Sequence, residues 1–176
     1  MSTSSRPDNY LMGYFGKDLI KSMLEDSGYA VCHYGYEDTL LDYKSKRTSK
    51  TSNSTTGRRL RKSPDLIVYD ENAVYLVEIK MRTKSPPYLP EEFDMLREFW
   101  KDAILVVIVP DENVFYAQEI EKVQVTLPGN VTLPRAVLTS FRGIREIFTR
   151  ISEDRISYYR KIALQTLQIF APEGQC

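Results

Sequence analysis

The sequence has few of the residues on which several common chemistries depend. It contains one histidine, His33, and two cysteines, Cys32 and Cys176, which excludes a histidine-based triad, a zinc cluster and a disulfide framework. The longest apolar run, residues 103–110, is too short to span a bilayer. Residues 1–9 are polar and lack the apolar stretch of a secretory leader, so we expect a reducing, cytoplasmic location.

The chain also has no net charge, because 24 basic residues balance 24 acidic residues in a sequence of 176 residues. The length suits one domain, and a hydrophobic fraction of 42% is sufficient for a core. The balance is uneven along the chain: residues 1–64 carry 11 basic and 7 acidic side chains, residues 65–125 carry 6 and 13, and residues 126–176 carry 7 and 4. The neutral total therefore does not exclude a nucleic-acid partner.

The most one-sided segment is residues 43–64, which hold eight basic residues and no acidic one. The spacers are mostly Ser, Thr, Asn and Gly, which bury little apolar surface, so the composition predicts a mobile loop. Phosphate groups are natural partners for such cations, and a solvated loop without a partner is the alternative. The basic residues are Lys44, Lys46, Arg47, Lys50, Arg58, Arg59, Arg61 and Lys62.

Hydrophobic periodicity predicts an α/β domain. Its first part has the order helix, three strands, helix, strand, at residues 9–26, 29–36, 65–70, 73–82, 90–101 and 103–109. The last of these strands is apolar throughout, which is typical of a strand buried on both faces.

The sequence after residue 110 predicts short strands followed by two helices. The strands are expected at 114–117, 123–127 and 131–138, with a hairpin turn at 128–130, and the helices at 141–151 and 153–170, capped by Ser140 and Ser152. Residues 1–110 are thus expected to form the core. Residues 111–176 are expected to extend the same domain and to offer a dimerisation element.

The two central strands place charged residues together. If the turn between them is centred on Glu71 and Asn72, Asp65 faces Glu78 across the hairpin. Lys80 lies on the face of Glu78 because side chains alternate along a strand. Opposed carboxylates need a compensating charge, and a divalent cation such as Mg²⁺ supplies it. A solvated strand end, neutralised only by the lysine, is the alternative.

Two strand segments resemble the signature of the PD-(D/E)XK nuclease superfamily. They are residues 63–68, Ser-Pro-Asp-Leu-Ile-Val, and residues 77–80, Val-Glu-Ile-Lys. The predicted elements over residues 9–110 match the αβββαβ core of that superfamily. The chain is most similar to its archaeal Holliday junction resolvase and Mrr-like endonuclease branches, through Gly16, Leu24, Gly28 and Tyr29.

This resemblance implies a restriction-endonuclease-like fold and a metal site. Asp65, Glu78 and the backbone carbonyl of Ile79 would bind Mg²⁺, with Mn²⁺ as a substitute, and Lys80 would be the catalytic lysine. One position departs from the family. Relatives often carry a Glu on the first helix where this chain has Lys17, and its neighbour Asp18 is the candidate replacement.

The implied function is that of a Mg²⁺-dependent endonuclease that hydrolyses DNA, including branched DNA, in repair or recombination. A homodimer is expected because symmetric cutting of two strands needs two sites. The basic residues of segment 43–64, together with Arg82 and Lys84, are the candidate nucleic-acid contacts, with RNA as an alternative ligand. A catalytically weak or inactive nucleic-acid-binding module on the same fold is the alternative function, because Lys17 stands at the expected Glu position.

Overall fold

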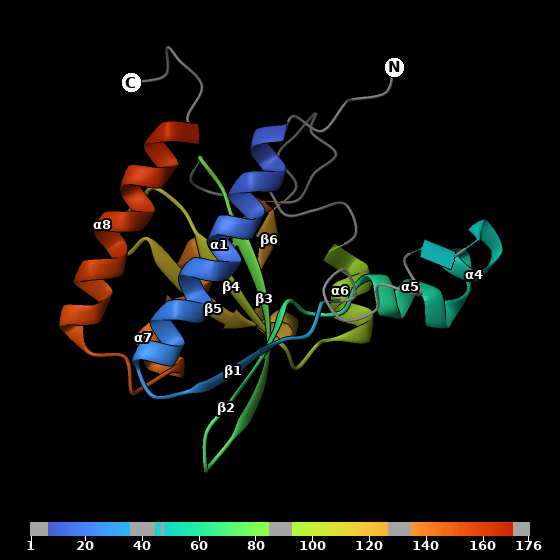
Figure 1. Ribbon diagram of the computed structural model, residues 1–176, viewed down its shortest axis with the longest axis horizontal. Coiled ribbons are helices and arrows are strands. Elements are labelled where there is room, and N and C mark those ends of the chain that lie inside the picture. Colours follow the sequence, from blue (N-terminus) through green and yellow to red (C-terminus); the bar gives the residue numbers. More distant parts are fainter. Residues whose placement is uncertain (1–6, 36–44, 47, 85–92, 127–134, 171–176) are drawn as a thin grey trace.

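A six-stranded mixed sheet forms the centre of the computed structural model, which describes residues 7–35, 45–46, 48–84, 93–126 and 135–170. The strand order is β1-β2-β3-β4-β5-β8, and helices cover both faces (Figure 1). The strands are β1 (Ala30–His33), β2 (Leu66–Tyr69), β3 (Val74–Met81), β4 (Ile104–Ile108), β5 (Phe115–Glu119) and β8 (Arg142–Gly143). The expected α/β fold is therefore confirmed.

The β3–β4 pair is parallel, whereas the other pairs in the large sheet are antiparallel. A parallel pair needs a crossover connection, and this one contains α6 (Phe93–Phe99). The β4 strand is buried along its whole length, as its apolar sequence predicts. A separate two-stranded sheet pairs β6 (Val125–Thr126) with β7 (Arg135–Ala136), which confirms the C-terminal hairpin. Its predicted turn, residues 128–130, lies outside the described residues.

The first helix, α1 (Pro7–Asp26), packs closely on the sheet. It ends in a Schellman motif, in which Gly28 has φ +83° and the Tyr29 amide donates to the Leu24 carbonyl at 3.1 Å. At Gly16 a β-carbon would lie 3.1 Å from the β-carbon of Met81, so the absence of a side chain allows the helix to approach β3. This approach places the middle of α1 next to the strand that carries Glu78 and Lys80.

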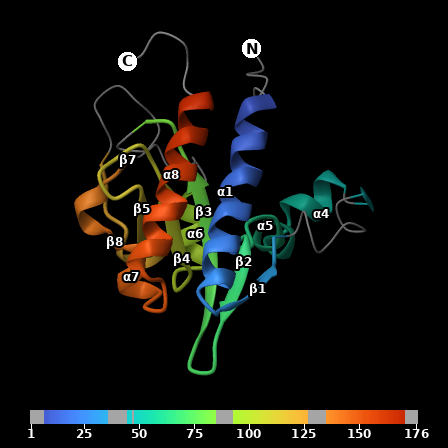
Figure 2. The same ribbon diagram turned by 60° about the vertical axis from the view of Figure 1, so that its left-hand side comes forward.

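The last helix, α8 (Glu153–Phe170), lies beside α1 on the same face of the sheet (Figures 1 and 2). Ser152 caps it as predicted, since its hydroxyl accepts a hydrogen bond from the Arg155 amide at 3.3 Å. The Tyr159 hydroxyl donates to the Asp26 carboxylate at 2.5 Å and links the two helices. The C-terminal extension thus supports the helix that faces the candidate site.

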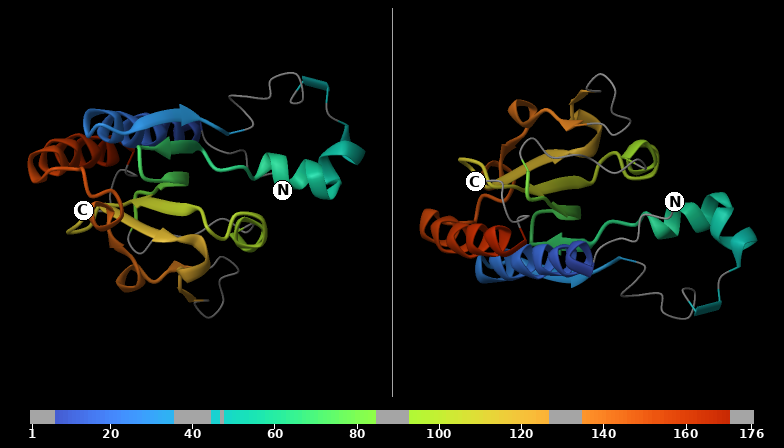
Figure 3. Two further views of the ribbon diagram at one scale, coloured as in Figure 1. Left: turned by 90° about the horizontal axis from the view of Figure 1, so that it is seen from below. Right: turned by 90° about the horizontal axis from the view of Figure 1, so that it is seen from above.

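The opposite face of the sheet carries a second apolar core, with α6 and the β6–β7 pair packed over it (Figure 3). Its buried side chains include Phe93, Leu96, Leu105, Val107 and Tyr116. No helix within the described residues is long and apolar enough to cross a membrane.

The basic segment is the first place where the structure corrects the sequence-based prediction. Instead of a loop, it contains helices α4 (Ser49–Asn53) and α5 (Thr55–Arg61), which project from one end of the sheet (Figure 3). The hydroxyl of Thr48 accepts the Thr51 amide at 3.2 Å, and the hydroxyl of Ser54 accepts the Gly57 amide at 3.0 Å. Hydroxyl residues that look like loop spacers are therefore helix caps. We call residues 48–62 the arm.

The predicted helix at residues 141–151 is the second correction. Residues 142–143 form β8 at the edge of the sheet, and only one helical turn, α7 (Ile144–Ile147), follows. Ser140 caps no helix, because it ends the 3₁₀ turn η2 (Leu138–Ser140) and its hydroxyl donates to the Val137 carbonyl at 2.7 Å. A further 3₁₀ turn, η1 (Ile120–Lys122), follows β5.

Candidate active site

The β2–β3 hairpin has the register that the sequence predicts. Leu66 pairs with Val77 and Tyr69 pairs with Val74. At the turn, the Asp70 amide donates to the Ala73 carbonyl at 3.0 Å. Asp65 and Glu78 are the next two residues in this register, so they lie opposite each other at the open end of the hairpin.

Asp65 is held rigidly at this end. Its carboxylate Oδ2 accepts a hydrogen bond from the Ile79 amide at 2.8 Å, across the two strands. Its backbone carbonyl accepts the amides of Tyr34 at 2.9 Å and Gly35 at 3.3 Å, where the chain leaves β1. With only 7% of the residue exposed, the carboxylate sits in a protein environment and not in bulk water.

Glu78 is equally buried, at 6% exposure, and its carboxylate Oε1 forms an ion pair with the Lys80 ammonium. Burial raises the pKa of Glu78 to about 7; the negative charge of Asp65 adds to this rise, and the positive charge of Lys80 opposes it. The predicted convergence of Asp65, Glu78 and Lys80 is therefore present as an electrostatically coupled group.

A second lysine completes this group. The Lys17 ammonium, from α1, lies 2.7 Å from Oδ1 of Asp65. Asp18, which we expected to replace the missing glutamate, is an exposed residue, and Lys17 is the α1 residue that contacts Asp65. The structure therefore gives no support to Asp18 as the third acid. The reason is rotation about the helix axis, since adjacent helical residues point in different directions.

The donor chemistry of the site suits a divalent cation held by two carboxylates. Carboxylate oxygens are ligands that Mg²⁺ accepts, and one or two protein carboxylates can suffice when waters and a substrate phosphate complete the shell. The described residues contain no cluster of three or more His, Cys, Asp or Glu side chains able to hold a metal. The site therefore offers two carboxylate ligands, Asp65 and Glu78. Each of them is paired with a lysine.

The predicted nucleic-acid contacts lie in two places. Arg82 and Lys84 follow β3 directly, and the half-buried Arg82 donates to the Met81 carbonyl at 2.8 Å. Lys50 and Arg58 are exposed on the arm. The other described cations of this set are the exposed Lys46 and Arg59 and the half-buried Arg61 and Lys62; Lys44 and Arg47 lie outside the described residues.

Two cations of the arm also have structural contacts. The Arg61 guanidinium donates to the Ser52 carbonyl at 3.0 Å and so links α5 to α4. The Arg59 guanidinium lies 4.9 Å from the centre of the Trp100 ring, which attaches the arm to the end of α6. These contacts explain why a segment rich in like charges is helical and not a free loop.

Sequence reasoning missed an aromatic surface beside the site. The Tyr10 and Tyr14 rings lie 5.3 Å apart on α1 and are both exposed, and the Lys17 ammonium is 5.7 Å from the Tyr14 ring centre. The spacing of residues 10, 14 and 17 places them on one face of a helix, which is the signal that could have revealed the surface.

A hollow of about 210 Å³ lies where the arm meets α6, lined by Tyr34, Thr56, Arg59, Leu60, Ser63 and Trp100.

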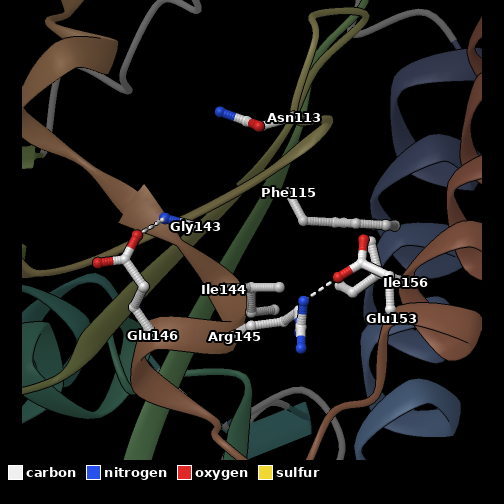
Figure 4. A pocket seen from close by; sticks show the side chains of 8 residues that line it. All are labelled: Asn113, Phe115, Gly143, Ile144, Arg145, Glu146, Glu153 and Ile156. Atoms are coloured by element: carbon white, nitrogen blue, oxygen red, sulfur yellow. Dashed lines mark hydrogen bonds and ion pairs between the residues drawn. The ribbon is translucent and has the colours of Figure 1, made fainter.

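Another hollow, of about 260 Å³, lies between β8, α7 and the start of α8 (Figure 4). Its charged residues have local partners. Glu146 accepts the Gly143 amide at 3.0 Å at the start of α7, and Arg145 forms an ion pair with Glu153. We interpret this hollow as part of the junction between α7 and α8 and not as a reactive site.

No protein-family model matches the sequence, and no curated protein matches it. Solved structures similar to the chain include Hjc of Archaeoglobus fulgidus, a Holliday junction resolvase from an archaeal hyperthermophile. The two chains are 14% identical with a TM-score of 0.50, over 80% of this chain and 98% of that chain. At this identity the likeness shows the fold, which is consistent with the restriction-endonuclease-like fold of Hjc.

Proposed function

We propose that this chain is a nuclease that hydrolyses phosphodiester bonds in DNA and acts in the cytoplasm. The observation that carries the proposal is the convergence of Asp65, Glu78 and Lys80 at one end of the β2–β3 hairpin, in a chain with a resolvase-like fold. The similarity to Hjc favours branched DNA as a substrate class. It also favours a homodimer, since cleavage of two strands by one assembly needs two sites.

The residues have distinct roles in this proposal. Asp65, Glu78 and the Ile79 carbonyl would hold Mg²⁺, or Mn²⁺ in its place, which polarises a phosphoryl oxygen and lowers the pKa of a bound water. Lys80 positions the attacking water and stabilises the negative charge that develops on the phosphorus oxygens. The hydrogen bond from the Ile79 amide holds the Asp65 carboxylate in one orientation.

The arm supplies a surface for the phosphate backbone. The chain from α5 reaches Asp65 within four residues, so the arm cations start close to the proposed scissile bond. The exposed tyrosines of α1 offer rings that can stack on sugars or unpaired bases. Cations and aromatic rings around an acidic site explain how a chain without net charge can bind nucleic acid.

Cleavage of linear, single-stranded and four-way-junction DNA with Mg²⁺ or Mn²⁺ tests the proposal. We expect Glu78→Ala to abolish cutting and Glu121→Ala, a change at an exposed residue of η1, to cut like the unmodified protein. Equal cleavage by the Glu78→Ala protein and the unmodified protein on every substrate would contradict the catalytic assignment. Sedimentation with and without DNA tests the homodimer, and a monomer under both conditions counts against it.

One observation favours a second candidate function, nucleic-acid binding without hydrolysis. Lys17 neutralises Asp65 where relatives often have an acid, which leaves two carboxylates in the described site. A binding module retains its affinity for DNA in EDTA and gives no cleavage with either metal. Cleavage that depends on Mg²⁺ and on Glu78 excludes this candidate.

A further inference from the structure

We propose that Lys17 is an internal counter-ion that makes metal binding at Asp65 and Glu78 depend on the arrival of a nucleic-acid phosphate. The inference rests on the proposed function, because it takes these two carboxylates as the metal ligands. It adds a residue and an order of events that the active-site assignment alone does not contain.

The first step concerns the charge of the site. Lys17 pairs with Asp65 at 2.7 Å, and Lys80 pairs with Glu78, so two carboxylates are balanced by two ammonium groups. When both carboxylates are ionised, a divalent cation that enters this set meets a neutral group of charges instead of a doubly negative one. Since both carboxylates are nearly buried, the repulsion between Lys17 and the incoming cation is only partly screened by water.

The second step concerns the freedom of Lys17 to move. Its side chain is 18% exposed, and its ammonium is 5.7 Å from the centre of the Tyr14 ring. A lysine has a flexible four-carbon side chain, so the ammonium can leave Asp65 and stay on the same face of α1, next to this ring. Lys17 can therefore release the carboxylate without a rearrangement of the helix.

The third step identifies what draws Lys17 away. Tyr14 and Tyr10 are 41% and 53% exposed, so the surface beside Lys17 is open to a ligand. A phosphodiester on this surface offers the ammonium a new negative partner and frees Asp65 for the metal. Bound nucleic acid then raises the affinity for the metal, and by thermodynamic linkage bound metal raises the affinity for nucleic acid by the same factor.

Calorimetric titration with Mn²⁺ alone, without DNA, tests the counter-ion. We expect weak binding to the unmodified protein, binding at least about tenfold tighter to Lys17→Met, and tighter binding still to Lys17→Glu, because each change makes the site more negative. Lys21→Met is the matched control: Lys21 lies one turn further along α1 and pairs with Glu25 at 2.6 Å. Equal Mn²⁺ affinity in Lys17→Met and the unmodified protein overturns the proposal.

A second measurement uses the unmodified protein and needs no variant to fold. Its Mn²⁺ affinity is measured with and without a short DNA duplex whose phosphorothioate linkages resist hydrolysis. The proposal expects affinity at least about tenfold higher with the duplex, and a clearly smaller gain in Lys17→Met, where direct ligation of the metal by phosphate is the remaining source of coupling. An equal gain in Lys17→Met and the unmodified protein overturns it. Equal Mn²⁺ affinity with and without the duplex also overturns it. Neither titration measures cleavage. A protein that never cuts DNA therefore contradicts the proposed function, whereas the role of Lys17 is decided by the Mn²⁺ affinities alone.

Discussion

The carboxylate of Asp65 accepts a hydrogen bond from the backbone amide of Ile79 at 2.8 Å. The side chain of the residue just before β2 therefore supplies an acceptor for a β3 amide beyond the last pair of the ladder, Leu66 and Val77. Asp65 thus has a structural role in addition to its proposed role as a ligand, and the two roles make separable predictions.

Replacing Asp65 should lower the free energy of unfolding by an amount that depends on whether the new side chain still accepts a hydrogen bond from the Ile79 amide. We expect Asp65→Ala to lower the free energy of unfolding by about 1–3 kcal/mol, because a buried amide loses its acceptor and Lys17 loses its partner. Asp65→Asn keeps an acceptor oxygen and should be less destabilising. Urea unfolding measures both, and an Asp65→Ala protein as stable as the unmodified one would mean that this hydrogen bond contributes nothing.

The two glycines within α1 should differ in their response to alanine. A β-carbon at Gly13 meets no atom within 4 Å, so Gly13→Ala should stabilise the protein by roughly 0.5–1 kcal/mol through helix propensity. At Gly16 the new atom would lie 3.1 Å from the β-carbon of Met81, which must move away. We expect Gly16→Ala to be less stable than Gly13→Ala in thermal unfolding. Equal gains from the two changes would show that α1 is not tightly packed at Gly16.

Stability should depend on pH through Glu78. Burial raises the pKa of Glu78 in the folded protein to about 7, from an ordinary value of 4.5. The folded state therefore holds this proton more tightly than the unfolded state does. The stabilisation is complete below pH 4.5 and is lost as the pH rises through 7.

We expect Glu78→Gln to remove this decline, because an amide does not titrate. The exposed Glu121→Gln serves as the control and should retain it. Urea unfolding across this pH range measures the effect, and a decline of equal size in Glu78→Gln and the unmodified protein would assign it to other groups. The same proton should make metal binding weaker below pH 7, since a ligand carboxylate must be ionised.

The arm should account for part of the salt dependence of nucleic-acid binding. Lys50 and Arg58 are exposed, so changing each to alanine should weaken DNA binding and reduce the slope of log affinity against log salt by about one unit for each phosphate that is no longer neutralised. Arg160, an exposed residue of α8, is the matched control. Fluorescence anisotropy at several salt concentrations gives the slopes, and equal slopes for the arm and α8 variants would contradict a specific role for the arm.

Local patterns in the sequence were enough to predict the hairpin that carries the site. A turn at Glu71 and Asn72 sets the register, and the register alone places Asp65 opposite Glu78. The pairing of Lys17 with Asp65 could not be predicted in this way. It depends on how α1 is rotated against the sheet, which is set by close approaches such as that of Gly16 to Met81.

The two wrong element predictions have a common physical cause. In the arm, Thr48 and Ser54 can serve as loop residues or as helix caps, and composition does not distinguish the two uses. In the segment that was predicted as a helix at 141–151, apolar residues at helical spacing belong to a short edge strand and a single helical turn. In both segments the choice depends on partners that are distant in the sequence, Trp100 for the arm and β5 for the strand.

The arm is inserted between two strands whose ends are already joined. His33 pairs with Leu66, and the amides of Tyr34 and Gly35 both donate to the carbonyl of Asp65, so the backbone closes the base of the insertion whatever side chains follow. Its sequence can therefore diverge, or be exchanged for that of another protein, without displacing the carboxylate beside it. Under the proposed function, evolution and engineering can therefore alter the nucleic-acid preference of the arm independently of the chemistry at Asp65.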